Sequence, residues 1–258
     1  MTRPLSARHA AANALMAEAG RRALRLFQAR EDLSLSAKAP MDFVSEADRD
    51  IERFFKCELR IAFPGQPLVG EEYGGEASDD CWVVDPIDGT ANFLRGSPLW
   101  GISLAHMRDG QPDLGVIHYP VLGLTLSAET GSGLWVDGKP ASRDARFDAA
   151  RVVAVGENTR WTPEAIAEVE LHLRKARWGV TGFRCASISL GFAALGRVDG
   201  YIERYTSLWD LAGGVVICAE AGLNVRWGGE LKPQGLWVMA GTPALMDQIA
   251  PIQTSITD

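Results

Sequence analysis

The chain has 258 residues, of which 47% are hydrophobic and 23% are charged, and its formal net charge is −7. This is the composition of a globular protein, and the length suits one large domain built from two halves. The negative charge disfavours nucleic acid as a partner, because nucleic acids bind basic surfaces. No apolar run approaches the roughly 18–20 residues that span a bilayer, so we expect no membrane partner. The N-terminus lacks the apolar core of a signal peptide, and we therefore expect a cytoplasmic protein.

The first third of the sequence predicts two helices. Apolar residues recur at spacings of three and four over 5–30, which indicates an amphipathic helix. Residues 31–43 have no clear period and are predicted to be irregular. A second helix is expected from Ser45, a candidate N-cap, with Asp48 at the third helical position completing a capping box. The segment PGQP at 64–67 ends this helix.

From residue 68 the pattern changes to short apolar runs separated by glycine, proline and aspartate. Such spacing predicts a mostly antiparallel sheet. The expected strands lie at 82–84, 100–105, 114–118, 124–128 and 134–136.

The last hundred residues alternate between strand and helix patterns. Strands are expected at 151–155 and 236–241, and helices at 162–176, 186–196, 209–222 and about 243–250. The chain is therefore predicted to be one domain, 1–258, of layered α and β elements. A helix-plus-sheet half covers about 1–145 and an α/β half covers about 146–258.

The four cysteines lie far apart in the sequence and form no CxxC pair. They are Cys57, Cys81, Cys185 and Cys218. We expect buried free thiols rather than disulfides or a zinc site.

The stretch CWVVDPIDGTANF at 81–93 ends an apolar run with two carboxylates, Asp85 and Asp88. Like charges at the end of a buried strand repel each other and lose hydration, so a cation is expected there. Pro86 fixes the backbone as the chain leaves the strand, and Gly89 permits a conformation that other residues resist. This geometry can direct both carboxylates at one point.

Two further acidic motifs follow apolar or small-residue segments. Glu71 and Glu72 stand in VGEEYGG, and Asp210 begins a helix rich in glycine and alanine. Clusters of carboxylates suit Mg²⁺, and no histidine or cysteine adjoins them to favour zinc. Convergence of several carboxylates predicts more than one Mg²⁺, an arrangement that clamps both oxygens of a phosphoryl transfer.

The segment GTANF, which begins at Gly89, completes the predicted site. A helical turn there would direct backbone N–H groups at a phosphate. The hydroxyl of Thr90 is placed to orient an attacking water, and Asp48 is the candidate to accept the proton of Thr90. Each motif alone also has a plain structural interpretation as a turn, a solvated surface or a helix cap, so the combination carries the prediction.

Together these residues resemble the inositol monophosphatase family of Mg²⁺-dependent, lithium-sensitive phosphomonoesterases. The stretches that carry the resemblance are DFVSEAD (42–48), GEE (70–72), WVVDPIDGTANF (82–93), GRVDGYIE (196–203) and WDLAGGVVICAEAG (209–222). The block DPIDGT, joined to the later WD block, is the specific part of this signature.

The resemblance implies a five-layered αβαβα sandwich, the fold of inositol monophosphatase and fructose-1,6-bisphosphatase, and usually a homodimer. It implies that Thr90 and Asp48 activate water, with Glu71 holding the Mg²⁺ that binds this water. The implied metal ligands are Glu71, Asp85, the Ile87 carbonyl, Asp88 and Asp210. The implied substrate-binding residues are Ile87, Asp88, Gly89, Thr90, Arg184, Ala186, Glu203 and Asp210, of which Glu203 would bond the ring of a sugar alcohol.

Two departures from the family pattern bear on the substrate. Ala91 replaces a threonine that usually follows DGT. In GFRCASIS, counting back from Asp199, Arg184 occupies the place of a glycine, and Cys185 and Ala186 take the next two places. Arg184 either reads a second anionic group on the substrate or folds away from the pocket.

The predicted function is Mg²⁺-dependent hydrolysis of a small phosphorylated metabolite, with inositol-1-phosphate as the first candidate. Histidinol-phosphate phosphatase is the main alternative. Fructose-1,6-bisphosphatase and nucleotide 3′-phosphatase are weaker options on the same scaffold. A non-catalytic regulatory member of the family is a further alternative, although no metal ligand is eroded.

Overall fold

A computed structural model describes residues 4–32, 35–39 and 42–257, and it describes no side chains for residues 32–45. The α-helices in these ranges are α1 (Ala7–Gln28), α2 (Glu46–Ala62), α3 (Thr90–Leu94), α4 (Pro163–Lys175), α5 (Ala186–Leu195), α6 (Leu208–Glu220), α7 (Pro243–Ile249) and α8 (Thr254–Thr257). Short 3₁₀ helices are η1 (Arg30–Asp32), η2 (Asp148–Ala150) and η3 (Ala250–Ile252).

The strands form a hairpin and two larger sheets. The hairpin pairs β1 (Leu35–Ala39) with β2 (Asp42–Ser45). The seven-stranded sheet contains β3 (Leu68–Gly70), β4 (Cys81–Asp88), β5 (Gly101–Arg108), β6 (Gln111–Tyr119), β7 (Leu124–Glu129), β8 (Trp135–Val136) and β9 (Lys139–Pro140), in that order. The five-stranded sheet has the order β11 (Gly179–Thr181), β10 (Val152–Val155), β12 (Gly200–Thr206), β14 (Leu236–Gly241) and β13 (Asn224–Gly229).

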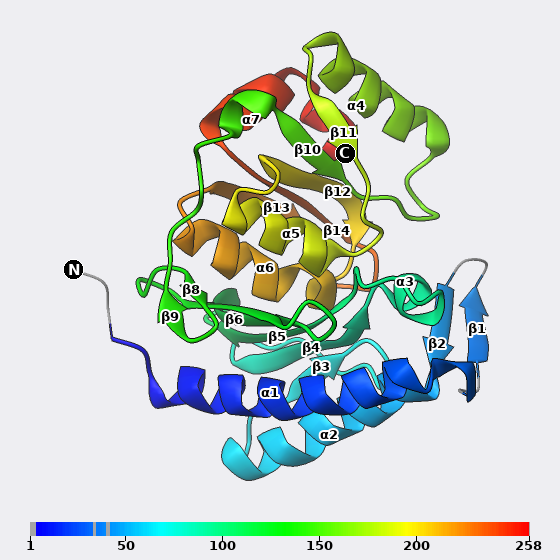
Figure 1. Cartoon of the computed structure of the whole chain (residues 1–258), viewed down its shortest axis with the longest axis vertical. Helices are drawn as coiled ribbons and strands as arrows, with labels where there is room; N and C mark the ends of the chain where they lie inside the picture. Colours follow the sequence, from blue (N-terminus) through cyan, green and yellow to red (C-terminus); the bar gives the residue numbers. More distant parts are fainter. Residues whose placement is uncertain (1–3, 33–34, 40–41, 258) are drawn as a thin grey trace.

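The elements stack in five layers, which Figure 1 shows from α1 and α2 at the bottom to α4 and α7 at the top. Between these outer layers lie the seven-stranded sheet, the pair α5 and α6, and the five-stranded sheet. One helical layer lies between the two sheets, and another covers the outer face of each sheet. Both faces of each sheet are therefore buried. The predicted αβαβα sandwich is confirmed.

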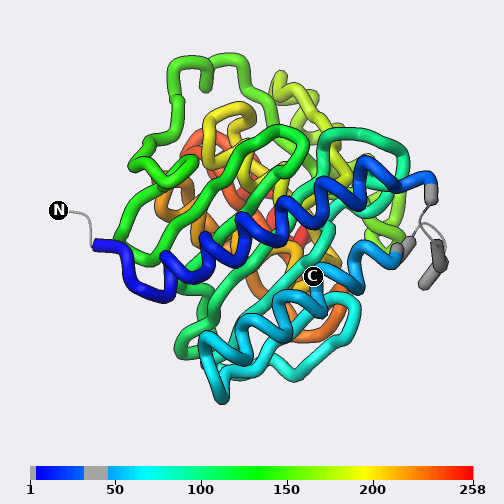
Figure 2. The backbone as a smooth tube through the Cα atoms, turned by 60° about the horizontal axis from the view of Figure 1, so that its bottom comes forward, coloured from blue at the N-terminus to red at the C-terminus, as the bar shows by residue number. Residues whose placement is uncertain are grey.

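Helices α1 and α2 cover the outer face of the seven-stranded sheet and lie side by side on it (Figure 2). Their apolar faces follow the helical period, with Ala12, Met16, Ala19 and Ala23 on α1 fully buried. From the sheet, the side chains that meet these helices include Trp82, Val84, Ile87, Ile102, Leu104, Leu114 and Val116.

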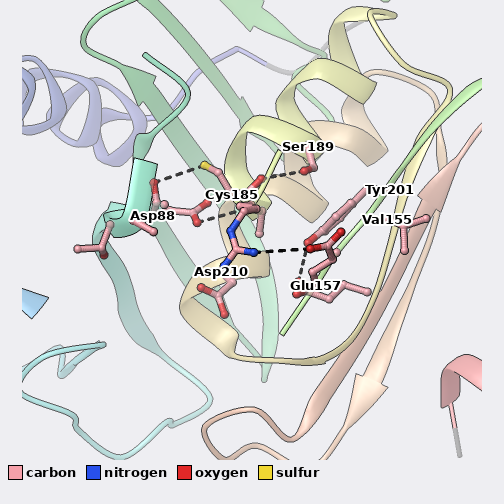
Figure 3. Close-up of a pocket in the computed structure, with 14 residues that line it drawn as sticks. Asp88, Val155, Glu157, Cys185, Ser189, Tyr201 and Asp210 are labelled. Atoms are coloured by element: carbon pink, nitrogen blue, oxygen red, sulfur yellow. Dashed lines mark hydrogen bonds and ion pairs between the residues drawn. The ribbon is translucent and has the colours of Figure 1, made fainter. Parts of the chain in front are cut away.

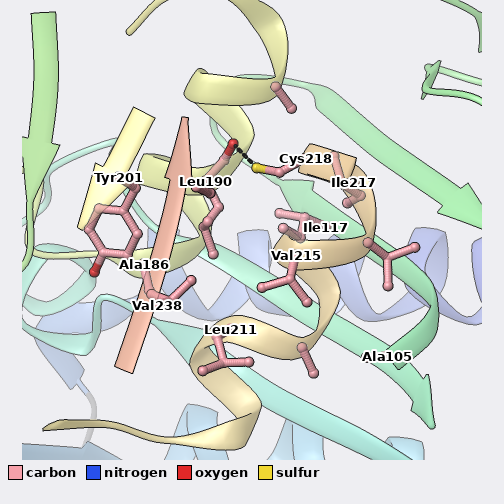
Figure 4. Packing of buried hydrophobic residues seen from close by; sticks show 14 of the residues in the cluster. Ala105, Ile117, Ala186, Leu190, Tyr201, Leu211, Val215, Ile217, Cys218 and Val238 are labelled. Carbon is pink, nitrogen blue, oxygen red and sulfur yellow. Dashed lines mark hydrogen bonds between the residues drawn. The ribbon is translucent and has the colours of Figure 1, made fainter. Parts of the chain in front are cut away.

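Helix α6 lies between the two sheets, and Figure 4 shows Leu211 and Val215 of this helix in the central core. The contact with β6 is close, because a Cβ added at Gly115 would lie 2.2 Å from the carbonyl oxygen of Gly213. The small residues that the sequence places in α6 therefore allow this helix to sit directly against the sheet. Such packing fixes the position of its first turn, which carries Asp210.

Most predicted elements are present within two or three residues of their expected bounds, with four corrections. Strand β12, the middle and mostly buried strand of the five-stranded sheet, was not among the expected strands. Residues 31–43 are not irregular where the structure describes them, because the end of η1, all of β1 and the first half of β2 lie there. The edge strands β11 and β13 were not indicated by the apolar pattern, which is weak in strands whose residues are mostly exposed or half-exposed. All four cysteines are free thiols, as predicted, but Cys57 is exposed rather than buried.

The proposed cap of α2 by Ser45 falls on a side chain outside the description. Within the described residues, no helix has both the length and the apolar character that a bilayer crossing requires.

Candidate active site

Strand β4 ends in two carboxylates that a β-bulge turns to the same side. Asp85 pairs with Ser103 and Asp88 pairs with Gly101, so three steps along β4 match two steps along β5. Residues three apart in a regular strand face opposite ways, and one extra residue restores the same face. The carboxylates of Asp85 and Asp88 therefore meet on the side of β4 that faces α6.

Asp210 joins this pair from the first turn of α6. One carboxylate oxygen from each of Asp85, Asp88 and Asp210 lies within 4.8 Å of the other two. The Oδ2 atom of Asp210 also accepts a hydrogen bond of 2.9 Å from the backbone N–H of Ser207. Asp210 thus caps its helix with one oxygen while the carboxylate stands beside the end of β4.

The cluster carries strong electrostatic strain. Burial raises the pKa of Asp85 well above its usual range, and the charge of Glu71 raises it further. Burial and the charges of Asp88 and Glu203 raise the pKa of Asp210 to about 7. Like charges at this distance in a desolvated site favour the binding of a cation or of protons.

Glu71 follows β3, which runs parallel to β4 with Gly70 paired to Val84. This register places Glu71 next to Asp85 along the sheet. The turn after Glu71 is anchored by the buried carboxylate of Glu52 on α2. Glu52 accepts hydrogen bonds from the backbone N–H groups of Glu72, at 2.7 Å, and Tyr73, at 3.0 Å.

Thr90 stands at the start of the short helix α3, directly after Gly89. Gly89 adopts the left-handed conformation, with φ of 86°, which a residue with a side chain adopts only at a cost. The Thr90 hydroxyl lies 3.2 Å from Oδ1 of Asp48 and 3.1 Å from the carbonyl oxygen of Ile87. Asp48 is fully buried in the first turn of α2.

Asp88 also contacts the N-terminus of α5. Its carboxylate accepts the N–H of Ala186 at 3.2 Å and the N–H of Ser187. Burial raises the pKa of Asp88, and these hydrogen bonds oppose the increase. The helix N-terminus, which favours negative charge, therefore holds Asp88 in place.

A cavity of about 190 Å³ opens beside the carboxylates (Figure 3). Glu203 on β12 lines it and is 8% exposed. The Glu203 carboxylate accepts the hydroxyl of Tyr201 at 2.5 Å and the amide of Asn158 at 3.4 Å. Glu203 is therefore a fixed polar group in the cavity wall and not a surface charge.

Arg184 also lines this cavity, on the loop before α5. Its backbone φ is 52°, in the left-handed region where the family pattern has glycine. The guanidinium forms an ion pair of 3.6 Å with Glu157, and both side chains are roughly half-exposed. Arg184 is therefore not folded away from the pocket.

Most of the predicted site residues lie in one region. Those that line the cavity are Asp88, Gly89, Thr90, Arg184, Ala186, Glu203 and Asp210. Asp85, the Ile87 carbonyl, Asp48 and Glu71 lie against these through the contacts described above.

Three residues that hold site residues in place were not predicted from the sequence, namely Glu52, Tyr201 and Asn158. For Glu52 a signal existed, because it is a charged residue within the apolar face of α2. For Tyr201 and Asn158 no such pattern exists, because their contacts with Glu203 arise only when β12 and the loop after β10 come together.

The site thus belongs to the class of carboxylate-rich hydrolytic centres on a layered α/β scaffold, and comparison with known proteins identifies the family. The model of the inositol monophosphatase family matches residues 5–257. The inositol-1-monophosphatase of Mesorhizobium japonicum is 36% identical over 80% of this chain and 79% of its own length. The histidinol-phosphatase of Chlorobaculum parvum is 35% identical over 79% and 76%. The crystal structure of the extragenic suppressor protein suhB from Bartonella henselae matches with a TM-score of 0.82 and 30% identity, over 97% of this chain and 98% of that one.

The chain belongs to the inositol monophosphatase family. The predicted family resemblance is confirmed, and so is the prediction that the protein is a phosphoric monoester hydrolase.

Proposed function

We propose that the protein is a Mg²⁺-dependent phosphatase that releases phosphate from a small phosphate monoester, with inositol-1-phosphate as the first candidate substrate. The observation that carries this proposal is the approach of Asp85, Asp88 and Asp210 to within 4.8 Å of one another beside a polar cavity. Carboxylates this close favour a bound cation, and their all-oxygen donor set suits Mg²⁺.

The residues present fit such an ion. Asp85, Asp88, Asp210, Glu71 and the Ile87 carbonyl are the proposed ligands. Bound Mg²⁺ would supply charge neutralisation at the phosphate and would lower the pKa of a bound water. The pKa values of Asp85 and Asp210 are raised by burial and, to a smaller extent, by the neighbouring carboxylates, and a divalent cation would offset both costs of the charged form.

The side chains of the chain position the reactants. The hydroxyl of Thr90, within 3.2 Å of Asp48, is proposed to orient a water and pass a proton to that carboxylate. Backbone N–H groups near Gly89 and Thr90 are proposed to bind the phosphate, and Glu203 to bond a hydroxyl of the leaving alcohol. The arrangement contributes mainly orientation and electrostatic stabilisation.

Histidinol-phosphate hydrolysis is the second candidate. The histidinol-phosphatase of Chlorobaculum parvum is 35% identical to this chain, and the inositol-1-monophosphatase of Mesorhizobium japonicum is 36% identical. Glu203, which faces the cavity as a buried acceptor, favours the polyol. A purely regulatory role is less well supported, because each proposed metal ligand is a carboxylate or a backbone carbonyl at the site. We also propose that the protein is a homodimer, which the family resemblance implies and which analytical ultracentrifugation tests. A cytoplasmic location, which the N-terminal sequence suggests, is a separate proposal that cell fractionation tests.

The test is phosphate release from inositol-1-phosphate, histidinol phosphate and fructose bisphosphate, with Mg²⁺ and with EDTA. We expect Mg²⁺-dependent release, at the highest rate from inositol-1-phosphate. Asp88→Asn should nearly abolish turnover, while Asp79→Asn, an exposed carboxylate ahead of β4, should leave it unchanged. Circular dichroism checks that both variants are folded. Release from none of the three esters, or wild-type turnover in Asp88→Asn, would refute the proposal.

A further inference from the structure

A second cavity adjoins the first on the far side of Arg184 and Glu157. Its volume is about 630 Å³. Arg184 and Glu157 line both cavities, so the two meet at this ion pair. The pair is half-exposed, and exposed pairs of this kind contribute only about 0–1 kcal/mol, so a ligand can displace it.

The wall of the second cavity differs in chemistry from that of the first. Its apolar side chains are Trp161, Pro163, Ile166 and Ala167, from the loop before α4 and the first turns of α4. Within the described residues, Arg184 is the one cationic side chain that lines either cavity. The first cavity is thus polar and acidic, and the second offers apolar surface for a ring or chain.

The sizes of the two cavities also indicate that part of a larger substrate binds in the second cavity. Sites for small organic ligands usually enclose about 300–1,000 Å³, whereas the first cavity has about 190 Å³. The proposed phosphate and metal ions already need that space. A larger alcohol therefore needs a neighbouring space. The cavity beyond Arg184, at about 630 Å³, is larger than the cavity of about 320 Å³ beside Glu71 and Asp210.

One hydrogen bond connects the second cavity to the proposed substrate site. Asn158 lines it and donates a hydrogen bond to Glu203, which lines the first cavity. Trp161 is 2% exposed, and its indole N–H has no hydrogen-bond partner within the described part of the chain. Because this nitrogen has almost no accessible surface, Trp161 contributes an apolar wall to the second cavity and not a donor that a ligand can reach.

We infer that the second cavity binds the alcohol part of larger substrates, and that the protein also hydrolyses phosphate monoesters whose alcohol carries an apolar or aromatic group beyond the reach of a single polyol ring. This inference rests on the proposed phosphatase function. Arg184 stands where the two parts of such a substrate join, which gives the residue that replaces the family glycine a role in specificity.

The test compares 3-phenylpropyl phosphate with propyl phosphate, which lacks the ring. We expect kcat/KM to be about tenfold or more higher for the phenyl ester, as burial of an apolar group in a specificity pocket predicts. Ala167→Trp, an exposed position on α4, fills the second cavity and should lower this ratio to about threefold or less. Glu168→Trp, on the same helix but outside the cavity lining, should keep the wild-type ratio.

Thermal melting of both variants shows whether α4 remains folded. The inference would be overturned if the wild-type protein hydrolysed the phenyl and propyl esters with nearly equal kcat/KM. It would also be overturned if Ala167→Trp left the ratio of the two kcat/KM values unchanged. The proposed function would stand in either case if inositol-1-phosphate is hydrolysed. Absence of Mg²⁺-dependent release from every ester tested would instead refute the phosphatase proposal, and the inference with it.

Discussion

Asp210 makes the metal-free protein less stable as pH rises. Its pKa increases from an ordinary 3.8 to about 7 because it is buried beside Asp88 and Glu203. Between these pH values the folded state holds a proton that the unfolded chain releases. Stability therefore falls as pH rises through this window, and the loss is complete above pH 7.

The rise from 3.8 to about 7 corresponds to about 4 kcal/mol at most. Asp210→Asn removes the charge and keeps an oxygen that can accept the N–H of Ser207. We expect this variant, relative to wild type, to gain about 2–4 kcal/mol in the free energy of unfolding on going from about pH 4 to about pH 8.

The assay is urea unfolding in EDTA at both pH values, with Asp79→Asn as the matched control. Excess Mg²⁺ at the higher pH should stabilise wild type more than Asp210→Asn, because the variant has lost a proposed ligand. If the difference in the free energy of unfolding between Asp210→Asn and wild type were the same at both pH values, the electrostatic argument would be refuted. It would also be refuted if wild type were more stable than Asp210→Asn at high pH without metal.

Two other substitutions test the supports of the site. Glu52→Gln leaves one acceptor for the two N–H groups of Glu72 and Tyr73, so we expect a loss of about 1–3 kcal/mol in stability and an increase of about 10–100-fold in the Mg²⁺ concentration for half-maximal activity. Glu58→Gln on the same helix is its control, and equal Mg²⁺ requirements for both variants would contradict a positioning role. Thr90→Val should lower kcat by about 100-fold or more with little change in KM, and Thr90→Ser should retain most activity. A Thr90→Val enzyme with normal kcat would show that the hydroxyl does not orient the water.

The sequence predicted the parts of the site that depend on local pattern. An apolar run that ends in Asp85 and Asp88 indicates a buried strand whose end favours a cation. The two carboxylates are only three residues apart in the sequence, so the local pattern is enough to predict this site. The helix that carries Asp210 follows from its period and its small residues. Edge strands such as β11 and β13 escaped detection, because half-exposed strands of three to six residues carry little hydrophobic pattern.

Other features of the site depend on contacts that no local pattern encodes. The β-bulge that turns Asp85 and Asp88 to one face is a property of how β4 pairs with β5. The contacts of Glu203 with Tyr201 and Asn158 form because β12 lies beside the loop after β10. The second cavity exists only because Arg184 and the start of α4 come together around Glu157.

The sequence by itself determined which groups are available, namely carboxylates at the ends of buried elements, a hydroxyl after a glycine, and an arginine where the family has none. The tertiary structure decided which of them meet. Local sequence fixes period, turns and caps, because these depend on neighbouring residues. The approach of Asp210 to Asp85 requires α6 to be enclosed between two sheets, and burial of the whole core determines that position.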